Sequence, residues 1–147
     1  MGRLKRLAYA FVGLLVGYAM LLLFLLSMAF RTRGWLLAQH AGEPALGLDA
    51  YPLYAIMSFL GWLLVGLPIA ILVPARSLAR LSRPVSVLTG AALGPLALFI
   101  MFVVLAHGHI FHIPVFRAVG TLCFYSILVS TPAFVVYVAL LRTGGRG

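Results

Sequence analysis

Four long apolar stretches dominate the sequence, and short segments that carry most of the charge separate them. The stretches run over about residues 7–30, 53–73, 85–106 and 118–141, and none contains Asp, Glu, Lys, Arg or His. Each is close to the roughly 20 residues that a helix needs to cross a bilayer. Because backbone groups in lipid must be hydrogen-bonded internally, we expect helices and not strands. The pattern predicts an all-α integral membrane protein, a four-transmembrane-helix bundle that forms a single domain over residues 1–147.

Composition agrees with this class and excludes two others. Of the 147 residues, 64% are hydrophobic and 9% are charged, whereas soluble domains are about half apolar and about a quarter charged. Such hydrophobicity excludes intrinsic disorder. The formal net charge of +9 does not indicate nucleic-acid binding, because Lys and Arg lie between apolar stretches and not on a solvated face. The predicted partner is therefore the lipid bilayer, together with other membrane proteins or a second copy of the chain.

The distribution of Lys and Arg over the connecting segments predicts the orientation. With a cytoplasmic N-terminus, three of the eleven basic residues lie outside, namely Arg31, Arg33 and Arg117, and the other eight lie inside. Cytoplasmic loops carry an excess of basic residues, so both termini are predicted to be cytoplasmic. The first apolar stretch is longer than the roughly 7–15 residues of a signal-peptide core, which predicts a retained anchor. The preference for Arg over Lys favours a bacterium, and hence its inner membrane.

Small residues recur at helical spacing and predict close helix packing. Gly13 and Gly17 form one GxxxG pattern in the first stretch, and Gly90 and Gly94 form another in the third. Such small residues let membrane helices approach closely. The fourth stretch has a stripe of small and polar side chains that includes Ser126, Ser130, Ala133 and Tyr137. Packing within one bundle is the favoured interpretation, and a dimer interface is the alternative.

Three prolines interrupt the predicted helices. Pro68, Pro95 and Pro132 lie within the second, third and fourth stretches, where each removes a backbone donor and should kink its helix. Broken helices occur at transport sites. However, no stretch contains the ionisable side chain that ion or proton transport usually requires. Kinked packing is therefore favoured over a transport site.

Four histidines are predicted on the outer side of the membrane. His107, His109 and His112 follow the third stretch, and His40 lies in the first outer segment. Histidine is a common ligand of transition metals, so a metal site here is a hypothesis. The favoured interpretation is an interfacial loop without a metal, because apolar residues surround these imidazoles, and no cofactor is otherwise predicted.

A basic segment connects the second and third stretches. Arg76, Arg80 and Arg83 have spacings of four and three residues, which would place them on one face if the segment is helical. Leu78 and Leu81 are then expected to point toward lipid. The segment is predicted to lie on anionic headgroups on the cytoplasmic side. Docking of an acidic cytoplasmic partner is the alternative.

Enzymatic activity has little support in the sequence. The only acids are Glu43 and Asp49, and no nucleophile motif such as GxSxG is present. The only cysteine, Cys123, lies inside the fourth stretch, where a thiolate would be costly. We therefore predict a non-enzymatic accessory or interaction subunit that works through helix packing. The alternatives are a small transporter or lipid-handling protein that uses the kinked helices, and metal binding by the outer histidines.

Overall fold

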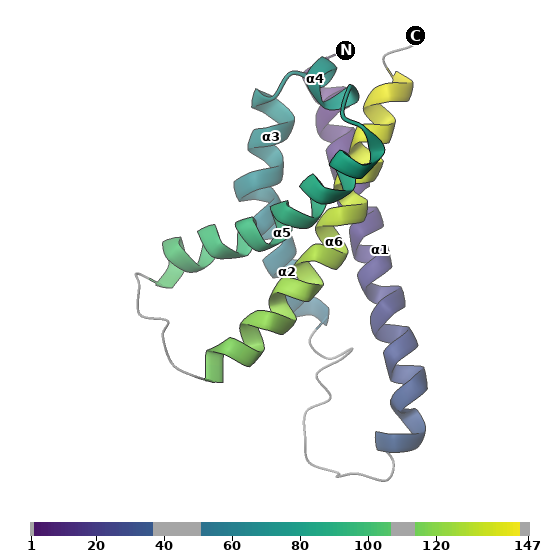
Figure 1. The fold of residues 1–147 in the computed structure, drawn as a ribbon, viewed down its shortest axis with the longest axis vertical. Helices are drawn as coiled ribbons and strands as arrows, with labels where there is room; N and C mark the ends of the chain where they lie inside the picture. The colour runs from purple at the N-terminus through teal and green to yellow at the C-terminus, as the bar shows by residue number, and fades with distance from the viewer. Residues whose placement is uncertain (1, 37–50, 107–113, 145–147) are drawn as a thin grey trace.

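The structure is a computed structural model that describes residues 2–36, 51–106 and 114–144. All regular structure within these ranges is helical (Figure 1). The helices in chain order are α1 (Arg3–Leu36), α2 (Tyr51–Gly61), the π-helix η2 (Trp62–Gly66), α3 (Leu67–Leu72), α4 (Ala75–Ala79), α5 (Arg83–Ala106) and α6 (Pro114–Gly144). The expected all-helical build is therefore confirmed for the described part of the chain.

Four helical segments are long and apolar enough to cross a membrane. In the described ranges they are Arg3–Met28, Tyr54–Leu72, Arg83–Met101 and Gly120–Gly144, with mean hydropathies of 2.4, 2.3, 1.8 and 2.0. Each overlaps one of the predicted apolar stretches. The helices themselves extend beyond those stretches at several ends, because a helix can continue through polar residues where its backbone bonds remain satisfied. These findings indicate a multi-pass membrane protein.

Helix α6 is the centre of the bundle. It packs closely against both α1 and α5, whereas the second span, made of α2, η2 and α3, approaches the other helices at far fewer places. Figure 1 shows α5 and α6 running antiparallel, side by side. The start of α1, the end of α6 and α4 all lie at one end of the bundle. The fold is thus a close-packed layer, α1–α6–α5, with a less closely packed second span.

The second span is broken in its middle. The π-helix lies between α2 and α3, and the backbone N–H of Leu67 donates to the carbonyl of Trp62, five residues earlier. Pro68 follows in the first turn of α3, where its missing N–H costs least. By contrast, α5 and α6 stay helical through Pro95 and Pro132. The irregular backbone is therefore concentrated in the span that packs least closely.

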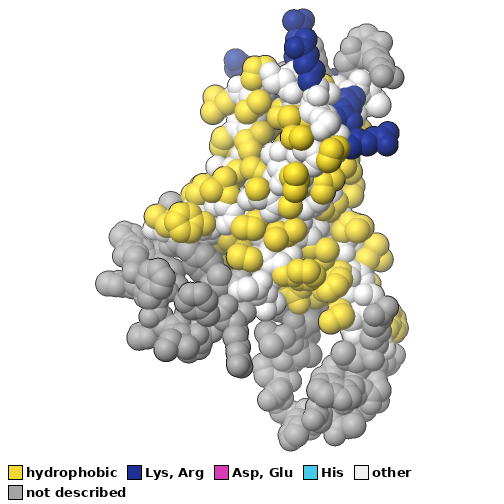
Figure 2. Space-filling model, in the orientation of Figure 1, with side chains coloured by type: hydrophobic (Ala, Val, Ile, Leu, Met, Phe, Trp, Pro, Cys, Tyr) yellow, Lys and Arg dark blue, Asp and Glu magenta, His cyan; other side chains and the backbone are white. Residues whose placement is uncertain are grey.

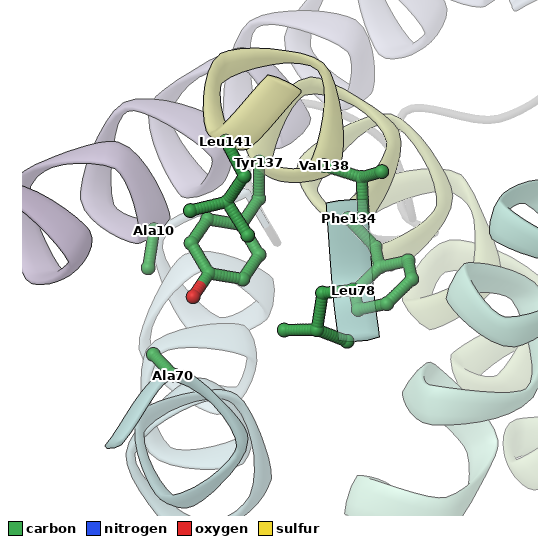
Figure 3. Close-up of a cluster of buried hydrophobic side chains, with 7 residues drawn as sticks. All are labelled: Ala10, Ala70, Leu78, Phe134, Tyr137, Val138 and Leu141. Atoms are coloured by element: carbon green, nitrogen blue, oxygen red, sulfur yellow. The ribbon is translucent and has the colours of Figure 1, made fainter. Parts of the chain in front are cut away.

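Two clusters of buried apolar side chains form the core. One lies near the end of the bundle that carries α4, and the other lies between α1, α2 and α6. The first contains Leu78 of α4, which is only 6% exposed and lies beside Phe134 (Figure 3). The expectation that Leu78 points toward lipid is wrong, because α4 folds over the end of α6 and buries this side chain. Leu81 is half-buried against the same cluster.

Candidate functional site

The glycines of α1 lie directly against the backbone of α6. A Cβ atom added at Gly13 would overlap the carbonyl of Ala133, and one at Gly17 would lie 2.5 Å from the carbonyl oxygen of Val129. Neither approach leaves room for a side chain. The absence of side chains at these two positions therefore sets the separation of α1 and α6.

The glycines of α5 face a different flank of α6. A Cβ at Gly90 would lie 2.9 Å from the Cα of Thr131, and one at Gly94 would lie 2.5 Å from the carbonyl oxygen of Ser126. The Ser130 hydroxyl donates a 2.6 Å hydrogen bond to the Gly90 carbonyl. Close approach and a bond between helices thus occur at the same place.

Both GxxxG patterns are therefore occupied by contacts within the chain. Of the two uses that the sequence left open, packing inside one bundle accounts for all four glycines. Small residues line α6 on both flanks, Ser126 and Ser130 on the α5 side and Ala133 on the α1 side. The sequence places these residues on a stripe, but it does not tell which helix covers each flank.

A partly open pocket, called the interior cavity below, lies between this layer and the second span. Its volume is about 110 Å³, and side chains from all four candidate spans line it. At a rise of about 1.5 Å per residue, the lining positions of α6 from Leu122 to Tyr137 extend over about 22 Å. The lining therefore extends along much of α6, and it includes Trp62, Val65 and Gly66 of the π-helix.

The chemical character of the cavity is apolar with several hydroxyl groups. Among the described residues, its lining contains no Asp, Glu, Lys, Arg or His. The hydroxyl-bearing residues of the lining are Tyr54, Ser58, Tyr125, Ser126, Ser130 and Tyr137. Two of the serine hydroxyls already donate to backbone carbonyls, Ser126 to Cys123 and Ser130 to Gly90. Such a lining suits a hydrocarbon chain better than an ion.

One hydroxyl of the lining has no partner. Tyr137 is 4% exposed, and its Oη atom makes no hydrogen bond within the described residues. Figure 3 shows the hydroxyl pointing into the space between Ala10 of α1 and Ala70 of α3. Buried polar groups are nearly always hydrogen-bonded. The position of Tyr137 on the polar stripe was visible in the sequence, but its missing partner was not.

Two arginines tie the helix ends together where α4 lies. Arg6 of α1 donates to the carbonyl of Val73, which ends α3. Arg142 of α6 donates from Nε to the Ala79 carbonyl at 3.1 Å, and from its terminal nitrogen to the Leu81 carbonyl. Arginine side chains can satisfy the free carbonyls at helix C-termini. The sequence indicated these arginines only as signs of orientation, because their acceptors come from distant segments.

The three arginines of the basic segment are exposed, but they do not share one helix. Arg76 lies in α4, Arg80 ends α4, and Arg83 begins α5 after two residues without helical structure. Figure 2 shows basic side chains gathered at one end of the molecule, with hydrophobic side chains over the rest of the coloured surface. The three arginines therefore do not share the single helical face that their spacing predicted. They still lie together with other basic side chains at one end of the molecule.

The predicted metal ligands lie outside the described residues. His40, His107, His109 and His112 all belong to ranges 37–50 and 107–113. In the part of the chain that is described, no three His, Cys, Asp or Glu side chains lie together. The metal hypothesis therefore stays a prediction from the sequence.

Comparisons with protein-family models, with curated proteins and with solved structures gave no match for this chain. The features that bear on its function are therefore the cavity, the arginine contacts and the packing of the four candidate spans.

Proposed function

We propose that this protein is a non-enzymatic, multi-pass membrane protein that handles a lipid or a similar apolar molecule, bound in the interior cavity. The observation that carries the proposal is the cavity itself, which all four candidate spans line and to which no described residue contributes a charged side chain. An ion or a polar solute would lose hydration there without finding a compensating charge. A hydrocarbon chain has no charge whose hydration would be lost, and it gains apolar contacts with the cavity lining.

The size of the cavity limits how much of a ligand it holds. Its volume of about 110 Å³ is somewhat below the roughly 150 Å³ of an engineered apolar cavity that binds benzene. At this volume it accepts only a segment of one hydrocarbon chain. Further room requires a shift of the second span, which packs less closely than α1 or α5 and contains the π-helix. Such irregular turns are frequent at functional sites.

A helix-packing accessory subunit is the second candidate. Apolar side chains such as Leu88 and Phe99 are well exposed on the outside of the bundle and could contact a partner helix as well as lipid. The glycine patterns, however, are turned toward α6 and are not free for such a contact. The lipid-handling function is preferred because it uses a specific feature of the interior.

We propose further that the protein lies in the inner membrane of a bacterium, with both termini in the cytoplasm. The basic end of the bundle supports this orientation through the excess of Lys and Arg on cytoplasmic loops. In a Cys123→Ser background, Ser77→Cys in α4 should resist a membrane-impermeant maleimide in intact spheroplasts and react in inverted vesicles. Thr32→Cys, near the far end of α1, should show the opposite pattern. Labelling of Ser77→Cys from outside would contradict the orientation.

Filling the cavity should abolish ligand binding. Trp62 lines the cavity and is one of two tryptophans, so a Trp35→Phe background leaves it as the only indole reporter. A chain-brominated fatty alcohol in detergent solution should quench Trp62 saturably, because bromine quenches indole fluorescence on contact. Ser58→Phe places a ring into the cavity and should weaken this binding at least about tenfold, the cost of losing buried contact with two methylene groups.

The matched control is Ser27→Phe, the same substitution at an exposed position of α1 outside the cavity lining. It should leave saturable quenching unchanged. Equal quenching in the Ser58→Phe and Ser27→Phe proteins would mean that the probe contacts only the outer surface, and the proposed function would then fail.

A further inference from the structure

Two buried polar atoms without partners among the described residues lie where α1 approaches α3. One is the Tyr137 hydroxyl, which points between α1 and α3. The other is Nε of Arg6, which is buried and makes no hydrogen bond within the described residues. Arg6 lies one helical turn from Ala10, on the same side of α1, and its terminal nitrogen contacts the end of α3. Both donors therefore belong to the gap between α1 and α3.

These two donors call for an acceptor that the described chain does not supply. An unpartnered buried donor costs free energy, and a donor that belongs to a charged group costs more. No carboxylate lies among the described residues, because Glu43 and Asp49 fall outside them. The charged side chains of described residues that are visible at this end are all Lys or Arg (Figure 2). An anionic group with several acceptor oxygens would satisfy both donors and the charge of Arg6 at once.

We infer that the ligand is an anionic amphiphile, a single hydrocarbon chain with a phosphate headgroup, whose phosphate is bound by Arg6 and Tyr137. This inference rests on the proposed function, since the chain occupies the interior cavity. The phosphate lies where the bundle meets the basic end, and the chain runs along α6 toward Tyr125 and Leu122. A headgroup at the end of the bundle and a chain in its interior match the layering of a bilayer.

The inference is tested by comparing two probes that share one chain. In the Trp35→Phe background, quenching of Trp62 is titrated with a chain-brominated alkyl phosphate and with the brominated alcohol of equal length. The phosphate should bind about tenfold more tightly, because charge-assisted hydrogen bonds are about twice as strong as neutral ones. Tyr137→Phe and Arg6→Gln should each remove most of this preference while leaving the affinity for the alcohol unchanged.

Matched variants separate the headgroup contact from general damage to the fold. Tyr137→Phe removes a hydroxyl without a described partner, so it should fold as well as the parent protein even if Arg6→Gln, which loses the Val73 contact, does not. Tyr125→Phe removes a hydroxyl at the opposite end of the lining and should keep the full preference for phosphate. Loss of preference in Tyr125→Phe but not in Tyr137→Phe would place the headgroup at the wrong end and overturn the inference.

The remaining outcomes are equally decisive. If the two probes bind equally well and Ser58→Phe still blocks both, the proposed cavity function stands and the anionic headgroup is refuted. If neither probe binds, both proposals fail. Inorganic phosphate is added as a competitor, and it should not displace the alkyl phosphate at equal concentration. Displacement by inorganic phosphate alone would indicate a free-anion site and would overturn the assignment to an amphiphile.

Discussion

Replacing Gly94 by alanine is expected to destabilise the protein by about 3 kcal/mol, the upper end of the usual cost of overpacking. The added methyl group would lie 2.5 Å from the Ser126 carbonyl oxygen, 2.6 Å from its carbonyl carbon and 2.6 Å from the Ser130 hydroxyl. Two of these atoms are backbone of the central helix and cannot rotate away. Relief therefore requires α5 and α6 to separate, which also stretches the 2.6 Å bond from Ser130 to the Gly90 carbonyl.

The measurement is the thermal midpoint of the purified protein in detergent, compared with Gly120→Ala. Gly120 belongs to α6, and no atom of the described residues lies within 4 Å of a Cβ added there. Because alanine favours helix over glycine by about 1 kcal/mol, the Gly120→Ala protein should be equal to or more stable than the parent. If Gly94→Ala kept its melting temperature but lost a crosslinked dimer, the glycines would serve an interface between chains and not the packing described here.

Replacing Arg142 by methionine is expected to loosen the end of the bundle and to cost about 3 kcal/mol, because hydrogen bonds from charged donors contribute about 1.5–3 kcal/mol. Arg142 satisfies the carbonyls of Ala79, the last residue of α4, and of Leu81, two residues further on. Methionine keeps the apolar stem and removes the donors. The segment between α3 and α5 should then open more often, so that trypsin cleaves after Arg80 at least about tenfold faster, in line with local unfolding.

Arg76→Met is the matched control. Arg76 is exposed on α4 and makes no hydrogen bond within the described residues, so this change removes a similar charge from the same end without removing a contact. Its melting temperature and its rate of trypsin cleavage after Arg80 should match those of the parent. Similar cleavage rates for the two variants would show that Arg142 acts through its charge alone.

The unequal packing of the spans connects stability with the proposed function. The α1–α6–α5 layer is held by four glycines at backbone contact and by a serine bond, so small movements within it are costly. The second span meets this layer across the cavity and is interrupted by η2 and Pro68. Under the proposed function, a ligand chain would enter by displacing the second span, while the layer would keep the proposed headgroup donors in place.

The hydrophobic pattern alone predicted the four helices, because a run of about 20 apolar residues leaves the backbone few alternatives to a helix. The pattern is local, and so the expected stretches agree with the described helices to within a few residues at most ends. The glycine and serine stripes were also predicted, since helical spacing places them on one face. The π-helix was not, because Pro68 predicts a kink without specifying how the backbone bonds rearrange.

The sequence by itself determined the class of the protein, the approximate limits of its helices and the excess of basic residues at one end, all of which depend on neighbours along the chain. Only the tertiary structure decided that both glycine patterns face α6 and that Leu78 is buried. Likewise, only the tertiary structure showed that Arg6 and Arg142 satisfy carbonyls 67, 63 and 61 residues away along the chain. It also decided that the Tyr137 hydroxyl is left without a partner beside a cavity. These features depend on which helix lies beside which, and the spacing of residues along one helix carries no information about its neighbours.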